Sequence, residues 1–381
     1  MTDEQLHAHL IGRQGSRHDL NTPVLIVDLD ALTRNIENMA AFARRHDIRL
    51  RPHAKTHKSP EIARRQLDAG AVGICCAKLG EAEVMADNGI ANGLHLTSPV
   101  VSPPAIARLL ALNARTDGLM VVVDNADNVR ALGAAARHAD KKLAVIIDID
   151  PGIRRTGVGS VAAAVALLAA IRAEAGLMYV GVQCYCGAQQ HIEDFELRRR
   201  DMDGRADFVR SIVAALTAAG GPPEIVTGGG TGTHRIDVAL DLFTELQAGS
   251  YVFMDRQYLD CDLSGDGLPT LFETALVIDA RVVSANTAGL VTLDAGLKAF
   301  STDAGDPQVL SGAPAGAAYR FIGDEHGALI LPDGGSLPLA HIVTLGAPHC
   351  DPTVNLYDTY HVVQGDTLRA LWPVAARGRS R

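Results

Sequence analysis

The sequence has few cysteines, few aromatic residues and no long apolar run. Its six cysteines among 381 residues form no Cys-x-x-Cys pair. We therefore expect reduced thiols, no disulfide bond and no structural zinc, as in a cytosolic enzyme. No apolar run reaches the roughly 20 residues of a membrane span, and the polar first 20 residues lack a signal-peptide core. The prediction is a cytoplasmic protein without a membrane partner.

Positive charge is scattered along the chain, and negative charge outnumbers it. The formal net charge is −9, and no basic stripe runs along the chain, so nothing matches the phosphate backbone of a nucleic acid. Hydrophobic residues make up 47% of the sequence, which is enough for one large domain and a smaller one.

Apolar runs that alternate with alanine-rich segments of helical period predict repeated strand and helix units. Long helices are expected between the strands, for example over 102–115 and 159–175. The nine predicted strands are 24–28, 48–53, 72–76, 93–97, 119–123, 143–149, 178–184, 224–227 and 247–254.

A closed parallel barrel uses eight strands, so the first of the nine should lie outside it. We therefore predict an α/β protein with a TIM-like (β/α)8 barrel over about 48–255. From about residue 266 the pattern changes to alternating strands separated by turn residues, which predicts a C-terminal antiparallel β domain. The polar stretch 256–268 is the expected boundary.

The segment RPHAKTHK carries Lys55 just beyond a predicted barrel strand. Such barrels keep their active sites at this carboxyl end. Desolvation and a neighbouring cation would lower the pKa of the lysine, and the neutral amine could then condense with an aldehyde. A basic surface loop is the alternative.

The segment TGGGTGT, residues 227–233, follows another predicted strand. Its backbone N–H groups suit a phosphate, although a tight turn between a strand and a helix explains the glycines equally well. It matches neither the Walker sequence nor the dinucleotide fingerprint.

The segment APHCDPT places His349 and Asp351 on either side of Cys350. In an extended strand His349 and Asp351 would point to the same side and could share a divalent ion, with Cys350 facing away. Water or substrate would complete the coordination sphere, as a catalytic metal requires. The alternative is a hydrogen-bonded surface pair.

Taken together, the ordered motifs resemble a known family of enzymes. RPHAKTHK, ICCAK, YCGAQQH, TGGGTGT, ELQAGSYVFMD, DAGLK, DEHG and PHCDPTVNLYD are similar to those of the D-threonine aldolase, D-3-hydroxyaspartate aldolase and D-serine dehydratase family. This family belongs to the alanine-racemase-like class of pyridoxal 5′-phosphate enzymes. The resemblance implies that residues 1–30 pack with the β domain, that 31–262 form the cofactor-binding barrel, and that 263–381 form the β domain.

The resemblance also implies the cofactor site. Lys55 matches the Schiff-base lysine, Arg155 the arginine at the pyridine nitrogen, and Tyr185 an active-site tyrosine. The phosphate would lie against two loops, which contribute Thr227, Gly229, Gly230 and Thr231, and Gly249, Ser250 and Tyr251.

The same resemblance makes His349 and Asp351 metal ligands and His191 the base for a hydroxyl proton. The carboxylate favours Mn²⁺, Mg²⁺ or Co²⁺ over Zn²⁺. The implied reaction cleaves a D-β-hydroxy-α-amino acid of the D-threonine type to glycine and an aldehyde. As an alternative, His191 could cap a helix near Glu193 and Asp194.

Three other functions stay open at this point. A D-serine or D-threo-3-hydroxyaspartate dehydratase would release a keto acid and ammonia. A non-catalytic pyridoxal-phosphate carrier would not need the second domain. A racemase would need a tyrosine base such as Tyr357 or Tyr360.

The resemblance has departures, and some of its contacts stay open. Ala77 replaces a frequent glutamine, and Ser98-Pro99 replaces Asn-Glu, so the substrate contacts are not determined. A homodimer is implied, and the substrate carboxylate could meet Arg154, Arg256 or His234.

Overall fold

Repeated strand and helix units build a parallel sheet between residues 49 and 246. The computed structural model describes residues 1–137, 139 and 141–381. In this part of the chain eight strands form the sheet in the order β2-β9-β8-β7-β6-β5-β4-β3. Their bounds are β2 Arg49–Leu50, β3 Ile74–Cys76, β4 Leu94–Leu96, β5 Met120–Val123, β6 Leu143–Ile149, β7 Leu177–Cys184, β8 Ile225–Gly228 and β9 Glu245–Leu246.

The two edge strands of this sheet meet and close the barrel. Just beyond β2, His53 forms a parallel bridge with Cys75 of β3, and the Cys75 N–H donates to the Pro52 carbonyl at 2.8 Å. All carboxyl ends therefore point to one rim, as the sequence predicts.

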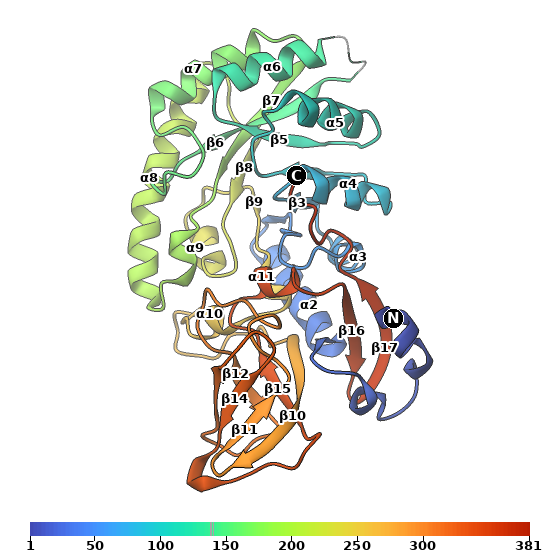
Figure 1. The fold of residues 1–381 in the computed structure, drawn as a ribbon. Coiled ribbons are helices and arrows are strands. Elements are labelled where there is room, and N and C mark those ends of the chain that lie inside the picture. Colours follow the sequence, from blue (N-terminus) through green and yellow to red (C-terminus); the bar gives the residue numbers. More distant parts are fainter. Residues whose placement is uncertain (138, 140) are drawn as a thin grey trace.

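Helices cover the outside of the barrel (Figure 1). Proline begins α3 and α5, where its missing N–H costs nothing, and the side chain of Asp194 caps α8. The helices are α1 Asp3–His7, α2 Leu29–Arg45, α3 Pro60–Asp68, α4 Leu79–Asp87, α5 Pro103–Ala114, α6 Ala126–Ala136, α7 Val161–Arg172, α8 Phe195–Ala218, α9 His234–Ala239, α10 Arg256–Leu259 and α11 Cys350–Val354. The helices predicted over 102–115 and 159–175 are confirmed as α5 and α7.

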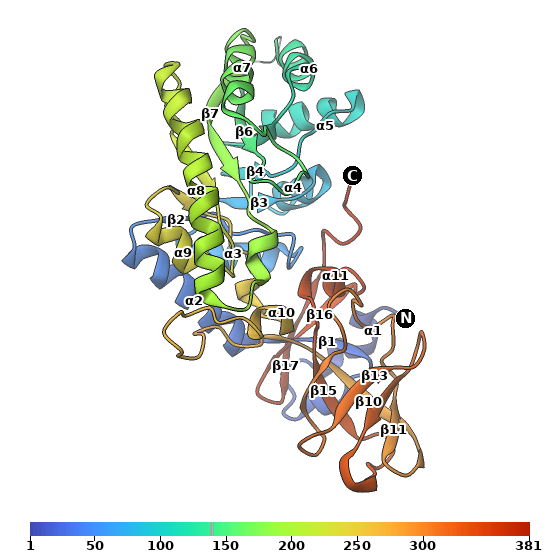
Figure 2. The same ribbon diagram turned by 90° about the vertical axis from the view of Figure 1, so that its left-hand side faces the viewer.

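A second sheet of nine strands lies below the barrel in Figure 1, and Figure 2 shows α10 and α11 at the junction between the two parts. Its strands are β1 Val24–Asp28, β10 Leu276–Thr287, β11 Leu290–Leu293, β12 Gln308–Ser311, β13 Ala318–Phe321, β14 Gly327–Ile330, β15 Ile342–Gly346, β16 Thr359–Gln364 and β17 Thr367–Pro373.

The first strand of the chain belongs to this second sheet, as predicted. β1 pairs antiparallel with β10 and parallel with β16. The predicted antiparallel β domain that takes in the N-terminal strand is therefore confirmed, with β1 and β16 as its parallel pair. This parallel pair arises because β1 enters the sheet from the opposite end of the chain and is not joined to its neighbours by hairpins.

The last predicted barrel strand was misplaced. The strand is Glu245–Leu246, and the predicted 247–254 segment instead contains a 3₁₀ turn over Ser250–Val252. Glu245 can lie in a buried strand because Arg51 forms a bidentate salt bridge with it at 2.8 and 3.0 Å. Buried charge disfavours a strand only when it lacks such a partner.

An apolar core continues from the barrel into the second sheet. Residues of α2, of the 246–254 segment and of the β strands form one buried cluster. Phe253 and Tyr360 pack within it with ring centres 5.7 Å apart. This shared core fixes α11 above the rim of the barrel.

Candidate active site

The carboxyl ends of three barrel strands bring Lys55, Tyr185 and Arg155 together. Lys55 follows β2, Tyr185 directly follows β7, and Arg155 lies in the loop after β6. The Lys55 Nζ atom is 5.5 Å from the centre of the Tyr185 ring. The guanidinium carbon of Arg155 is 5.4 Å from the same centre. Three residues that the resemblance assigned to one site are thus neighbours.

These three residues line a cavity of about 550 Å³, a volume typical of small-molecule sites. Ala77, Ser98 and Pro99 line it as well. The positions at which the sequence departs from its resemblance therefore face the cavity, where they can affect what binds.

The pKa of the Lys55 ammonium group differs from the expectation. Burial lowers the pKa of its ammonium, but the nearby Tyr185 and Asp351 side chains outweigh burial and raise that pKa overall. The expected lowering was therefore wrong, because the Tyr185 side chain and the Asp351 carboxylate of α11 both lie near the amine. Asp351 Oδ1 lies 3.8 Å from Lys55 Nζ.

His349 and Asp351 approach each other at the start of α11. Asp351 lies in the first turn of this helix, and His349 is its N-cap residue. The predicted extended strand was therefore wrong, since a proline at position 352 favours the first turn of a helix. The His349 Nε2 and Asp351 Oδ2 atoms still lie 3.9 Å apart, and Cys350 is buried.

His191 ends the 3₁₀ turn Ala188–His191 and packs on Tyr258 with ring centres 4.6 Å apart. Burial lowers the pKa of its imidazole, and nearby His349 lowers it further. Its Nδ1 atom is buried and has no partner in the described residues. It does not cap α8, because Asp194 does so through the Leu197 N–H.

The two predicted phosphate loops lie side by side. The first begins with Thr227 near the end of β8 and continues with Gly229, Gly230 and Thr231 just beyond that strand, and the second follows β9 and contains Gly249, Ser250 and Tyr251. The Tyr251 N–H donates to Thr231 Oγ1 at 3.0 Å and joins them. None of these seven residues is among those that line the 550 Å³ cavity.

The loops nevertheless have the features of an anion cradle. The Thr56 hydroxyl is buried without a partner in the described chain, and a Cβ on Gly249 would lie 2.8 Å from it. A side chain on Gly230 would overlap the Gln190 amide. Bare backbone beside an unpaired hydroxyl suits a phosphate group.

The metal pair also fits its expected occupant. Asp351 Oδ2 is buried and accepts no hydrogen bond within the described residues, while Lys55 Nζ lies 3.8 Å from the other oxygen, Oδ1. A buried oxygen without a hydrogen bond is costly, and a metal ion beside Oδ2 would satisfy it. Oδ2 faces the imidazole nitrogen of His349. One carboxylate and one imidazole are ligands that Mn²⁺ and Co²⁺ accept.

Several polar residues of the cavity were missed from the sequence. Gln247 donates to Gln183 Oε1 at 3.1 Å, and Gln183 donates to Asp148 Oδ1 at 2.9 Å. Gln183 and Gln247 line the cavity. Gln183 and Asp148 interrupt apolar strands, and this interruption was the available signal.

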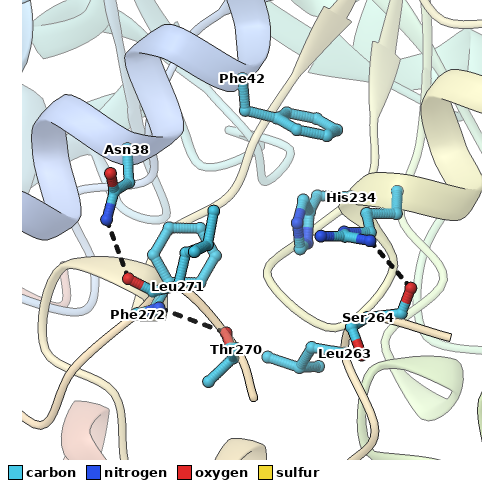
Figure 3. Close-up of a pocket in the computed structure, with 9 residues that line it drawn as sticks. Asn38, Phe42, His234, Leu263, Ser264, Thr270, Leu271 and Phe272 are labelled. Atoms are coloured by element: carbon cyan, nitrogen blue, oxygen red, sulfur yellow. Dashed lines mark hydrogen bonds between the residues drawn. The ribbon is translucent and has the colours of Figure 1, made fainter. Parts of the chain in front are cut away.

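The suggested carboxylate partners have other contacts. The Arg256 guanidinium donates to the Asp306 carbonyl. The bond from Arg154 to Asp150 comes from its backbone N–H and does not engage the guanidinium. His234 Nδ1 lies 2.8 Å from the Thr231 carbonyl oxygen, behind the glycine loop. It lines a separate pocket of about 30 Å³ beside Phe42 and Phe272 (Figure 3).

Two family models match the chain. The alanine racemase N-terminal domain matches residues 27–257, and the putative serine dehydratase domain matches residues 275–363. The first alone covers more than half of the sequence.

Named relatives extend this similarity to almost the whole chain. A D-threonine aldolase from Arthrobacter sp. is 39% identical over 95% of this chain and 94% of its own. A 3-hydroxy-D-aspartate aldolase from Paracoccus denitrificans (strain Pd 1222) is also 39% identical, over 95% and 93%. A D-threo-3-hydroxyaspartate dehydratase from Delftia sp. (strain HT23) is 34% identical over 75% and 74%.

A solved structure shares the fold closely. The crystal structure of a D-threonine aldolase from Filomicrobium marinum superposes with a TM-score of 0.90 at 38% identity, covering 95% of this chain and 97% of that one. No helix in the described residues is long and apolar enough to cross a membrane. The chain therefore belongs to the alanine-racemase-like enzyme family that includes the D-threonine and 3-hydroxy-D-aspartate aldolases.

Proposed function

We propose that this protein is an aldolase that uses pyridoxal 5′-phosphate and a divalent metal to cleave D-β-hydroxy-α-amino acids to glycine and an aldehyde. The observation that carries the proposal is the approach of Asp351, in the first turn of α11, to within 3.8 Å of the barrel residue Lys55. The two aldolase relatives match 95% of the chain, whereas the dehydratase relative matches 75%. This difference supports an aldolase over a dehydratase.

In this proposal the barrel holds the cofactor. Lys55 would bind it covalently, Arg155 would face its pyridine nitrogen, and Tyr185 would lie beside it. The backbone of the two glycine-containing loops would hold the phosphate. Bound pyridoxal phosphate withdraws electrons from the bonds at Cα of an attached amino acid.

His349 and Asp351 would hold the metal, for which Mn²⁺, Mg²⁺ or Co²⁺ suits the donor set better than Zn²⁺. A bound divalent ion lowers the pKa of a hydroxyl group that it contacts. Water or the substrate hydroxyl would supply the ligands that the protein does not.

His191 would take the proton of the β-hydroxyl oxygen. Its lowered pKa keeps the imidazole neutral near pH 7, so a lone pair is available. The Cα–Cβ bond then breaks, the hydroxyl oxygen becomes the aldehyde oxygen, and Cα gains a proton to give glycine.

Replacing the histidine ligand tests the metal step separately from cofactor binding. We expect His349→Ala to retain the visible absorbance of bound pyridoxal phosphate but to lose Mn²⁺-dependent cleavage of D-threonine by ~100-fold or more. Unchanged turnover would rule out this metal site.

The proposal extends to the state of the protein in the cell. The six cysteines are free and buried, as suits a reducing cytoplasm. A homodimer, in which the second sheet of one subunit faces the barrel mouth of the other, is proposed from the family resemblance.

A further inference from the structure

A short segment between β11 and β12 lies against the residues that would bind the metal. The Ser301 hydroxyl donates to the His349 carbonyl at 3.1 Å. The Ser301 N–H donates to Thr353 Oγ1 of α11 at 3.0 Å. Two hydrogen bonds therefore anchor this segment to His349 and to Thr353, two residues beyond Asp351.

Asp303 extends from the same segment to the His349 ring. Its Oδ2 atom lies 2.7 Å from His349 Nδ1. An ionised carboxylate can only accept a hydrogen bond, so Nδ1 carries the proton. The lone pair of the neutral imidazole is then at Nε2, the atom that lies 3.9 Å from Asp351 Oδ2.

We propose that Asp303 is a positioning residue for the metal: it fixes the tautomer and the ring orientation of His349 so that Nε2 points to the ion. Carboxylates that hold the distal nitrogen of a metal-bound histidine raise its basicity and restrict its rotation. This inference rests on the proposed metal site.

A second histidine cluster shows that the tautomer decides whether a histidine nitrogen can bind a metal. Asp3, His7 and His361 place three possible ligand atoms within 4.8 Å of one another. However, the Asn21 N–H donates to His7 Nε2 at 3.1 Å, so the proton of His7 is on Nδ1, 2.8 Å from His361 Nε2. The nitrogen that faces the cluster is thus a donor, and the contacts of His7 are those of a hydrogen-bonded pair.

Mn²⁺ binding to the cofactor-loaded protein tests the inference without an activity assay. The free Mn²⁺ signal in electron paramagnetic resonance gives the dissociation constant directly. We expect Asp303→Ala to weaken Mn²⁺ binding by ~10-fold, which is the lower end for a lost carboxylate partner because Asp303 is half exposed.

Two further variants separate positioning from simple loss of charge. Asp303→Asn loses the charge but keeps an oxygen that can accept a hydrogen bond from the Nδ1–H group. It should therefore bind Mn²⁺ more tightly than Asp303→Ala and less tightly than the wild type. Asp306→Ala removes a carboxylate from the same segment that pairs with Arg320 at 3.0 Å, and it should bind Mn²⁺ like the wild type.

A spectroscopic measurement reports the hydrogen bond itself. With Cu²⁺ in the site, electron spin-echo modulation detects the distal imidazole nitrogen, and Asp303→Ala should change its quadrupole coupling. Equal Mn²⁺ affinity and an equal coupling in wild type and Asp303→Ala would overturn the inference. Absence of Mn²⁺ binding by the wild type would instead overturn the proposed metal site.

Discussion

Asp237 supports the glycine loop with a carboxylate that is fully removed from solvent. Its Oδ2 atom accepts hydrogen bonds from the Thr233 hydroxyl at 2.6 Å and the Gly230 N–H at 3.4 Å. Burial raises the pKa of this carboxyl to about 7, and the two hydrogen bonds offset only part of the rise.

This raised pKa makes the stability of the fold depend on pH. The folded state binds the proton more tightly than the unfolded chain, whose Asp pKa is about 4, so this group stabilises the fold less and less as pH rises from about 4 to about 7. We expect Asp237→Asn to remove this slope and to become more stable relative to wild type by up to about 4 kcal/mol between pH 4 and pH 8. Urea unfolding across this range measures it. A constant difference between the two proteins would contradict the assignment.

Gly229 is the loop position least able to carry a side chain. Its φ is +70°, and a Cβ there would overlap the Asp237 carboxylate. We expect Gly229→Ala to weaken pyridoxal-phosphate binding by ~10-fold, because the free loop can relieve a left-handed strain of about 1–2 kcal/mol by leaving the conformation that binds the phosphate. A cofactor titration followed by absorbance measures this loss, and unchanged affinity would place the phosphate elsewhere.

At the scale of elements, α8 contains a glycine that serves as a control for Gly229. Gly204 lies exposed in this 24-residue helix, and nothing lies within 4 Å of a Cβ built there. Gly204→Ala should therefore raise the unfolding free energy by ~0.5–1 kcal/mol and leave cofactor affinity unchanged. A lower melting temperature for this variant would show that the helix tolerates no side chain at that position.

Most barrel strands were predicted from the sequence, because a buried apolar run can be identified without knowing its contacts in the fold. The prediction failed at β9, where the Arg51–Glu245 pair lies about 190 residues apart in the chain. It failed again at α11, because the extended backbone ends at His349, the N-cap residue, and still leaves His349 near Asp351 in the first turn. Long-range pairing and local capping decide these cases, and a periodicity cannot represent them.

The candidate site was predicted unevenly for the same reason. Motif resemblance located Lys55, Tyr185 and Arg155, which the fold brings together. Asp303 gave no signal, since its role depends on a contact with His349 across 46 residues.

At the scale of the whole molecule, the barrel and the second sheet meet at Asp255. The carboxylate accepts the N–H of Cys350 at 2.8 Å and the N–H of Tyr258 at 3.3 Å, so one side chain caps both α10 and α11. Burial raises the pKa of this carboxyl to about 6. The domain limits predicted at residues 30 and 262 stay predictions. The bond between Asp255 and Cys350 joins residues that lie on either side of the limit at 262.

Asp255→Ala should weaken this joint. It leaves a buried N–H unpaired, and we expect a loss of about 1–3 kcal/mol in unfolding free energy together with weaker Mn²⁺ binding. Asp255→Asn retains an acceptor and should lose less. Urea unfolding and Mn²⁺ titration test both variants, and a wild-type response from Asp255→Ala would show that α11 is held by its other contacts.

The products of the reaction test the central claim most directly. The purified protein would be incubated with pyridoxal phosphate and Mn²⁺, and D-threonine, D-threo-3-hydroxyaspartate and D-serine would be supplied separately. We predict equal amounts of glycine and aldehyde from a D-β-hydroxy substrate, with acetaldehyde or glyoxylate identifying its side chain. A keto acid with ammonia would show a dehydratase, and no turnover of any of the three would contradict an aldolase.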